Sequence, residues 1–381
     1  MDKIFYILLI GLFITALLTT FFLSKTFEIN IQKNRNSVLD GMRGYLAFSV
    51  FCHHSLIWYF YIQKKIWSIT ASNLHFHLGS SSVAFFFMIS GFIFFSKIIK
   101  KKNINWVEFY ISRILRMYPL YLVLLIIIFI IIGVLTNWEM RVDFLTLVLS
   151  ILDLLKFATP EINKYESFYI MGGATWSLKY EICFYLMLPI IALILKKNKT
   201  SIFFIIISIL TIILVIFDKQ YNLIIMSCFL VGFFANILSF NKKFTSFSKK
   251  KISSFIVIIC IGILFINYSD TYRKIPLILL SISFICIACG NDMFGILKNR
   301  ISIILGQISY SIYLIHPILL FITFHFIIKI DDAKILTPIQ YSVIILVLVP
   351  ILIIISFFSY KFLEAPGMNS KKKIVDWIKK I

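Results

Sequence analysis

Charged side chains are scarce in this chain. Of its 381 residues only 14% are Asp, Glu, Lys or Arg, whereas 60% are hydrophobic and Phe alone occurs 40 times. A soluble domain of this length needs a far larger polar surface, and the mean hydropathy of +0.95 agrees. The composition therefore excludes an ordinary soluble protein and indicates that a lipid bilayer surrounds most of the chain.

Acidic residues are scarcer still. There are 17 Asp and Glu against 38 Lys and Arg, which gives a formal net charge of +21. In a soluble protein such an excess suggests nucleic-acid binding. Here the basic residues form short clusters between apolar runs, which suits anionic lipid headgroups and topology control. We therefore expect membrane lipids, and no nucleic acid, as partners.

Metal-binding and redox motifs are also lacking. The six cysteines all lie within or at the edge of apolar runs. Cys286 and Cys289 have a CxxC spacing, but they have neither polar flanks nor the second ligand pair that a zinc site needs. No metal is expected, and the cysteines are interpreted as small apolar residues of membrane helices.

Long hydrophobic runs recur along the whole chain. The first is longer than the apolar core of a signal peptide and no small-x-small cleavage site follows it, so it is predicted to be retained. An amphipathic stretch at about 142–157 is predicted to lie at the interface or to re-enter the membrane. Eleven runs are long enough to cross a bilayer: 4–23, 42–61, 78–96, 117–135, 177–195, 201–217, 221–240, 253–268, 275–290, 302–329 and 340–362.

The loops between these runs follow the positive-inside rule. One alternating set of loops, from 24–41 to 364–381, contains 24 Lys and Arg. The other set, from 1–3 to 330–339, contains ten. The bias predicts a multi-pass protein of the cell (inner) membrane, with the N-terminus outside and the C-terminus in the cytoplasm.

Ionisable residues inside the apolar runs are the candidates for chemistry, because charge at that depth is costly and usually functional. Arg43 and His54 are 11 residues apart, so they share one helix face and lie about 16 Å apart along the axis. Asp40 lies on nearly the same face. Arg43 is then near the cytoplasmic surface and His54 in the middle third of the bilayer. His53 points about 100° away and is expected to pack against another helix.

Two groups flank the later runs. Arg113 and Arg116 share a helical face at the cytoplasmic mouth of the fourth run and suit phosphate groups, with topology control as an equal alternative. Glu181 lies about one turn inside the outer end of its run, where a carboxylate can accept a proton or orient an imidazole. The plain structural interpretations are an interfacial anchor for Trp176 and an N-cap for Ser177.

Other polar positions have simpler expectations. Ser90 and Gly91 form a small pair that allows close helix packing. His316 lies near mid-membrane before a proline, and structural and functional roles are equally open for it. His75 and His77 are assigned to an outward loop, where they need no special role.

Six motifs together resemble the membrane-bound acyltransferase-3 family, and their shared order makes the resemblance specific. They are L-D-G-x-R-G with a histidine eleven residues after the arginine (Leu39 to His54), F-F-x-x-S-G-F (Phe86 to Phe92), R-x-x-R before Y-P (Arg113 to Pro119), W-S-L-x-x-E (Trp176 to Glu181), S-Y-x-x-Y-x-x-H (Ser309 to His316) and E-x-P (Glu364 to Pro366). Two departures are the added 4–23 helix and the lack of the family's frequent C-terminal SGNH-type domain. A stand-alone membrane acyltransferase is therefore expected.

The resemblance implies an all-α, polytopic bundle of about 11 transmembrane helices, a ten-helix core plus one. The expected divisions are 1–36 for the added helix and its loop, 37–368 for the acyltransferase-3 domain and 369–381 for a basic cytoplasmic tail. It also implies transfer of an acyl group, usually acetyl, from acyl-CoA to a hydroxyl of a surface glycan such as O-antigen or exopolysaccharide.

The predicted site has two parts. The catalytic residues are His54, Glu181, Arg43 and Asp40, and the residues assigned to acyl-CoA binding are Arg113, Arg116, Trp176 and Ser177. His54 would act as general base or accept the acyl group itself, and Glu181 would orient its imidazole. A transporter or flippase of a lipid-linked glycan fits many helices and buried polar residues equally well. A structural or sensory protein gives no reason for burying Arg43, His54 and Glu181.

Overall fold

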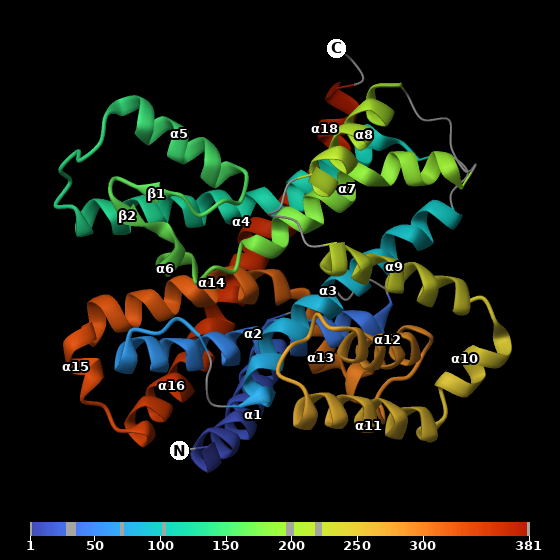
Figure 1. Cartoon of the computed structure of the whole chain (residues 1–381), viewed down its shortest axis with the longest axis horizontal. Helices are drawn as coiled ribbons and strands as arrows, with labels where there is room; N and C mark the ends of the chain where they lie inside the picture. The colour runs from blue at the N-terminus through green and yellow to red at the C-terminus, as the bar shows by residue number, and fades with distance from the viewer. Residues whose placement is uncertain are drawn as a thin grey trace.

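The computed structural model is an all-α bundle, as the sequence predicts (Figure 1). It describes residues 2–27, 36–68, 72–100, 104–195, 202–217 and 223–378. The predicted basic loop at 196–200 lies outside these residues, as do parts of the loops after the first and third runs. Within them the two short strands β1 (Glu161–Ile162) and β2 (Tyr165–Glu166) form one antiparallel pair.

The helices follow the predicted runs closely. They are α1 (Asp2–Thr26), α2 (Ser37–Lys64), α3 (Asn73–Lys100), α4 (Trp106–Leu135), α5 (Phe144–Leu155), α6 (Ser167–Met171), α7 (Trp176–Ile194), α8 (Ile202–Phe217), α9 (Leu223–Leu238), α10 (Lys242–Ser248), α11 (Lys251–Asn267), α12 (Lys274–Ala288), η1 (Ile296–Lys298), α13 (Arg300–Gln307), α14 (Ser309–Ile322), η2 (Thr323–Ile327), α15 (Ile330–Lys334), α16 (Pro338–Ser359), η3 (Tyr360–Glu364), α17 (Ala365–Asn369) and α18 (Lys371–Ile378).

Polar caps set where several helices begin. The side chains of Asn36 and Asn105 accept hydrogen bonds from the first turns of α2 and α4. Thr337 and Gln340 form a reciprocal capping box at the start of α16. Such caps satisfy backbone donors that the helix itself leaves unpaired. The starts of α2, α4 and α16 are therefore specified by the local sequence.

Helix α2 is the centre of the bundle. It packs against α3 on one side and against α13 and α14 on another, while α1 lies along α16 and α3 along α9. In Figure 1, α5, β1, β2 and α15, which belong to predicted outward loops, lie at the left, and α10, from an inward loop, lies at the right. These segments of the two loop sets therefore lie on opposite sides of the view.

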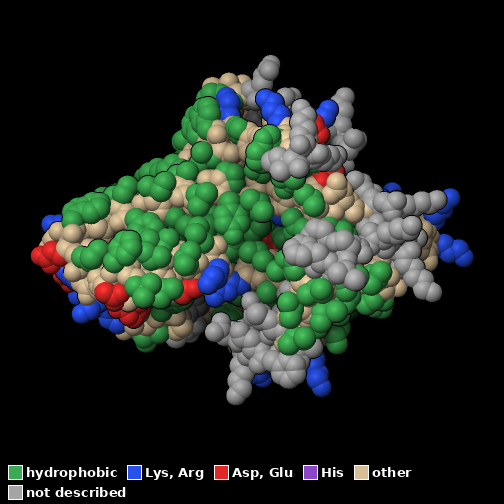
Figure 2. Space-filling model, turned by 90° about the horizontal axis from the view of Figure 1, so that it is seen from above, with side chains coloured by type: hydrophobic (Ala, Val, Ile, Leu, Met, Phe, Trp, Pro, Cys, Tyr) green, Lys and Arg blue, Asp and Glu red, His purple; other side chains and the backbone are tan. Residues whose placement is uncertain are grey.

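The outer surface is strongly apolar. Figure 2 shows hydrophobic side chains covering much of the visible face. Ile10, Ile126 and Ile258 are each about half or more exposed, at 64%, 60% and 48%. An apolar surface of this extent is typical of contact with lipid and not with water.

Six helical stretches of the described chain are long and apolar enough to cross a membrane, or seven if the bent pair α9 and α10 is one span. Helices α11 and α12, with 17 and 15 residues, are shorter. Helix α2 has 28 residues, about 42 Å of helix, but it carries Asp40, Arg43 and two histidines, which lower its hydropathy. The count of eleven crossings stays a prediction.

Two expectations about local structure are wrong. The run 302–329 is not one helix, because it is divided into α13, α14 and the π-helical turn η2. His75 and His77 do not lie in a loop. Both are buried in α3, where His77 Nδ1 bonds to Ser81 and Thr271 at 2.9 Å each. The helix starts earlier than hydropathy indicates because both imidazoles find partners: His77 bonds to Thr271 and the Tyr268 carbonyl, and His75 bonds to Ser72.

Small residues bring the central helices together. A Cβ on Gly91 of α3 would lie 2.2 Å from the Phe229 carbonyl oxygen of α9, which confirms the predicted close packing at the Ser90–Gly91 pair. A Cβ on Gly306 of α13 would lie 1.7 Å from the Asp40 carbonyl oxygen of α2. No side chain fits at such a distance, so both glycines are required by backbone contact.

Replacing Gly306 should therefore disturb the bundle. We expect Gly306→Val to lower the thermal midpoint of the detergent-solubilised protein, since overpacking costs about 1–3 kcal/mol or more. Fluorescence-detected size exclusion after heating measures it. The matched control is Gly262→Val on α11, where an added Cβ meets nothing within 4 Å. Equal stability of the two variants would contradict the contact.

Candidate functional site

A cavity of about 1000 Å³ opens between α2, α3, α4, α7 and α14. Its wall includes six of the eight residues predicted for the site. These are Asp40, Arg43, Arg113, Arg116, Ser177 and Glu181. The fold therefore brings together side chains from three helices that are far apart in the sequence.

One end of the cavity is strongly basic. Lys97, Lys100 and Lys249 join the three arginines on its wall, against only two acidic residues, Asp40 and Glu181. The lysines lie at the ends of helices on the side of α10, whereas the arginines lie further in. An apolar bundle that keeps six cations around one hollow attracts a polyanion.

Arg113 is held by its neighbours on three helices. Its guanidinium lies 5.2 Å from the ring centre of Phe94 on α3 and 6.0 Å from that of Tyr185 on α7. One of its terminal nitrogens donates to Ser112 at 2.9 Å. Stacked arginines keep most of their donors in one plane, which suits bidentate contact with phosphate oxygens.

Arg116 and Arg43 share an acidic neighbour that hydropathy gave no reason to single out. Glu364, at the end of η3, is buried and interacts electrostatically with both arginines. Its carboxylate accepts a hydrogen bond from Ser311 on α14. The E-x-P motif of the family was the sequence signal for this residue, which places a buried carboxyl group near both arginines.

Glu181 makes contacts other than the predicted one. Its Oε1 accepts hydrogen bonds from Ser90 on α3, at 3.2 Å, and from Tyr185 one turn along α7. These bonds place the carboxylate on the cavity wall beside Arg113, and its bonded partner is not the imidazole of His54. The orienting role predicted for Glu181 therefore has no direct contact in this arrangement.

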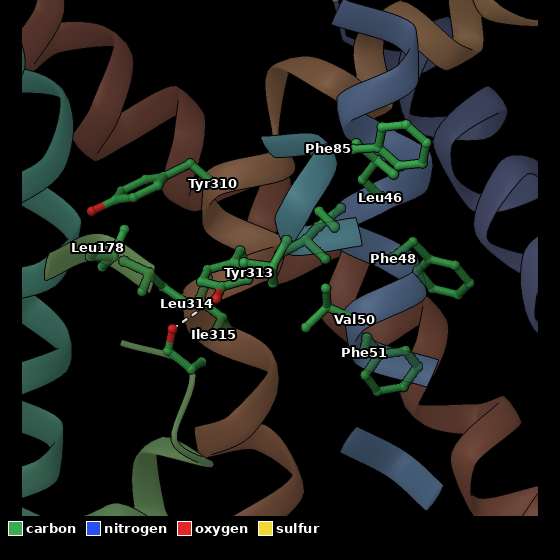
Figure 3. Packing of buried hydrophobic residues seen from close by; sticks show 14 of the residues in the cluster. Leu46, Phe48, Val50, Phe51, Phe85, Leu178, Tyr310, Tyr313, Leu314 and Ile315 are labelled. Atoms are coloured by element: carbon green, nitrogen blue, oxygen red, sulfur yellow. Dashed lines mark hydrogen bonds between the residues drawn. The ribbon is translucent and has the colours of Figure 1, made fainter. Parts of the chain in front are cut away.

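The inner end of the cavity is apolar and closes on one tyrosine. Val83, Phe86 and Leu178 line it. The hydroxyl of Tyr313 forms hydrogen bonds with the Ser177 hydroxyl at 2.8 Å and with the Ala174 carbonyl at 2.7 Å. Figure 3 shows Tyr313 of α14 reaching toward the start of α7, beside Leu178. Ser177 is thus part of this closure and not the N-cap of α7, which is Thr175.

His54 lies behind this closure. It is not on the cavity wall, but its Nδ1 is 3.0 Å from Nε2 of His316, and the His316 ring lies 6.1 Å from that of Tyr313. Two backbone carbonyls hold the pair, that of Val50 at 3.1 Å from His54 Nδ1 and that of Ile312 at 2.9 Å from His316 Nδ1. The partner of His54 is therefore a second histidine.

Other residues considered in the sequence lie away from the cavity or the histidine pair or serve packing. His53 packs against α3, with Nδ1 2.8 Å from the His75 carbonyl, as predicted. Trp176 is 37% exposed and stands edge-on to Phe87 and Tyr180, away from the cavity. All six cysteines are buried and none forms a disulfide. The residues that the structure describes contain no cluster of three or more His, Cys, Asp or Glu able to hold a metal.

Comparison with known sequences agrees with the motifs. A family model described as an acyltransferase domain matches residues 36–360. No curated protein and no solved structure matches the chain. The matched span contains every predicted site residue, and it covers most of the chain. The protein belongs to the acyltransferase-3 family and is a membrane acyltransferase.

Proposed function

We propose that this acyltransferase moves an acyl group of acetyl size from cytoplasmic acyl-CoA to a hydroxyl of an extracytoplasmic or lipid-linked glycan. One observation carries the proposal. The cavity has a basic outer end, an apolar inner end and a histidine pair immediately behind the inner end. This order of charges matches the order of parts in acyl-CoA, whose phosphates lie at one end and whose acyl group lies at the other.

The basic end suits the phosphates of CoA. Arg113 and Arg116, with Arg43 further in, would bind them, and Lys97 and Lys100 would draw them in from solvent. A volume of about 1000 Å³ lies at the upper end of the usual range for small-molecule sites. The apolar end, between Phe86 and Leu178, leaves room for a short acyl group near Tyr313.

The reaction is a single acyl transfer. His54 Nε2 takes the proton of the acceptor hydroxyl while the hydroxyl oxygen bonds to the thioester carbonyl carbon. The carbon–sulfur bond breaks, and the departing thiolate takes up that proton, which leaves an O-acyl ester and free CoA. For this step the Tyr313–Ser177 hydrogen bond must open, since it separates the cavity from His54. The acceptor would approach from the other side, where α6 ends at Gly172.

A transporter or flippase of a lipid-linked glycan was the alternative. Membership of an acyltransferase family and the position of two histidines beyond the cavity favour chemistry over transport. Release of CoA by the purified protein from radiolabelled acetyl-CoA, dependent on an added saccharide acceptor, is the direct test. Transport of a lipid-linked glycan without CoA release would overturn the proposal.

Removing the base should stop the reaction. We expect His54→Ala to lower kcat by about 10²–10⁴-fold, the usual contribution of general-base catalysis, with CoA affinity unchanged. The matched control is His53→Ala, the adjacent histidine that packs against α3. A His54→Ala variant that is folded and acylates at the wild-type rate would contradict this role.

Removing the arginine pair should weaken donor binding. The double substitution Arg113→Ala and Arg116→Ala deletes two charge-assisted contacts, so the Kd of CoA should rise at least about tenfold, or about 1.4 kcal/mol. Isothermal titration with CoA measures it. The control is Arg273→Ala, whose exposed ion pair with Asp270 lies in a predicted outward loop. Unchanged affinity in the double variant would remove the assigned role.

The basic mouth of the cavity should face the cytoplasm. In a Cys289→Ser background, we expect Ser96→Cys, on the cavity wall, to react with an impermeant thiol reagent in inside-out vesicles but not in right-side-out vesicles. Added CoA should slow the reaction. Ser356→Cys is the control, since Ser356 is fully buried in α16 away from the cavity. Labelling of Ser96→Cys from the outside would reverse the orientation.

A further inference from the structure

The neighbours of the His54–His316 pair favour one arrangement of protons. A backbone carbonyl oxygen can only accept a hydrogen bond, so the Nδ1 atom facing the Ile312 carbonyl must carry the proton of neutral His316. Its Nε2 then has a lone pair, and it faces Nδ1 of His54 at 3.0 Å. His54 Nδ1 also faces a carbonyl, that of Val50 at 3.1 Å. Both neighbours of Nδ1 favour the His54 proton there, and the Gly172 carbonyl, which also interacts with this ring, is the acceptor that competes for it.

We infer that His316 is a positioning residue, which holds His54 in the Nδ1-protonated tautomer and leaves Nε2 of His54 as the base. The inference rests on the proposed function for the step that Nε2 performs. This relay is a chain of hydrogen bonds from the Ile312 carbonyl through His316 to His54. Residues of α14 therefore determine which nitrogen of His54, on α2, carries the proton. It assigns a role to the second histidine, for which sequence reasoning left structure and function equally open.

The base edge of His54 faces the end of α6. A Cβ on Gly172, whose φ is +57°, would lie 3.7 Å from His54 Cδ2, the ring atom next to Nε2. The same Cβ would lie 3.0 Å from Pro317, the residue after His316. The backbone of Gly172, with a carbonyl that interacts with the His54 ring, therefore borders the reactive nitrogen on this side.

A neutral partner suits this depth in the membrane. When His54 takes a proton on Nε2, its Nδ1–H keeps its hydrogen bonds to the His316 lone pair and the Val50 carbonyl, and these bonds become stronger because the donor is now charged. They stabilise the imidazolium in the position that the carboxylate occupies in a serine-protease triad. Between turnovers the pair carries no charge, and neutral side chains cost far less to bury in a bilayer than a carboxylate. His316 thus takes the role that the carboxylate has in such a triad, and no charged side chain is buried between turnovers.

Substitutions that differ only in the acceptor atom test this role. His316→Gln places an amide oxygen near the position of Nε2, whereas His316→Leu and His316→Phe remove the acceptor. We expect kcat to fall about 10²-fold or more in the Leu and Phe variants, with the Kd of CoA unchanged, and to recover at least tenfold in the Gln variant. Equal losses in all three variants, or wild-type kcat in the Leu or Phe variant, would overturn the inference.

A spectroscopic measurement separates this inference from the proposed reaction. Solid-state NMR of ¹⁵N-histidine-labelled protein, with His54→Ala to assign the signal, reports which nitrogen of His54 carries the proton. We expect a protonated Nδ1 and an unprotonated Nε2 in the wild type, and a mixture of tautomers in His316→Phe. The opposite tautomer in the wild type would refute the relay even in an active enzyme. The expected tautomer would stand if CoA release from acetyl-CoA were never observed.

Discussion

A bilayer supplies no water to ionisable side chains, so each one that is buried must find its partner within the protein. That constraint explains how the central helices of this structure meet. His54 meets His316, and Glu181 meets Ser90 and Tyr185. Each of these contacts joins two helices or two turns, so the polar groups of the site also hold the bundle around it.

The same constraint gives the cavity its polarity. Six basic side chains gather at one hollow, where their hydration is kept and a polyanion can replace it. Beyond them the wall becomes apolar and ends at a tyrosine hydroxyl with both of its hydrogen bonds made inside the protein. The histidine pair lies past that point, and in the inferred arrangement both rings are neutral between turnovers. Charge therefore decreases along the path that an acyl group would follow.

Helix positions were the part of the fold that the sequence predicted best. Most apolar runs coincide with a helix, because the length and hydropathy of a run are local properties that decide whether it can cross a bilayer. The errors arose where polar side chains interrupt that signal. His75 and His77 were assigned to a loop, but Thr271, 194 residues away, bonds to His77 inside α3. The break at Ile308 follows Gly306, the position at which α13 approaches the backbone of α2.

The site divides in the same way. The sequence by itself determined that the chain is a membrane acyltransferase, since the order of its motifs is a property of the sequence alone. It also predicted Asp40, Arg43, Arg113, Arg116 and Glu181 as charged residues of the site, and the structure places all five on the wall of one cavity. Only the tertiary structure decided their partners. Glu181 bonds to Ser90 and Tyr185, and His54 bonds to His316, a residue 262 positions away. No local pattern contains such a contact, because it exists only when α2 and α14 pack against each other.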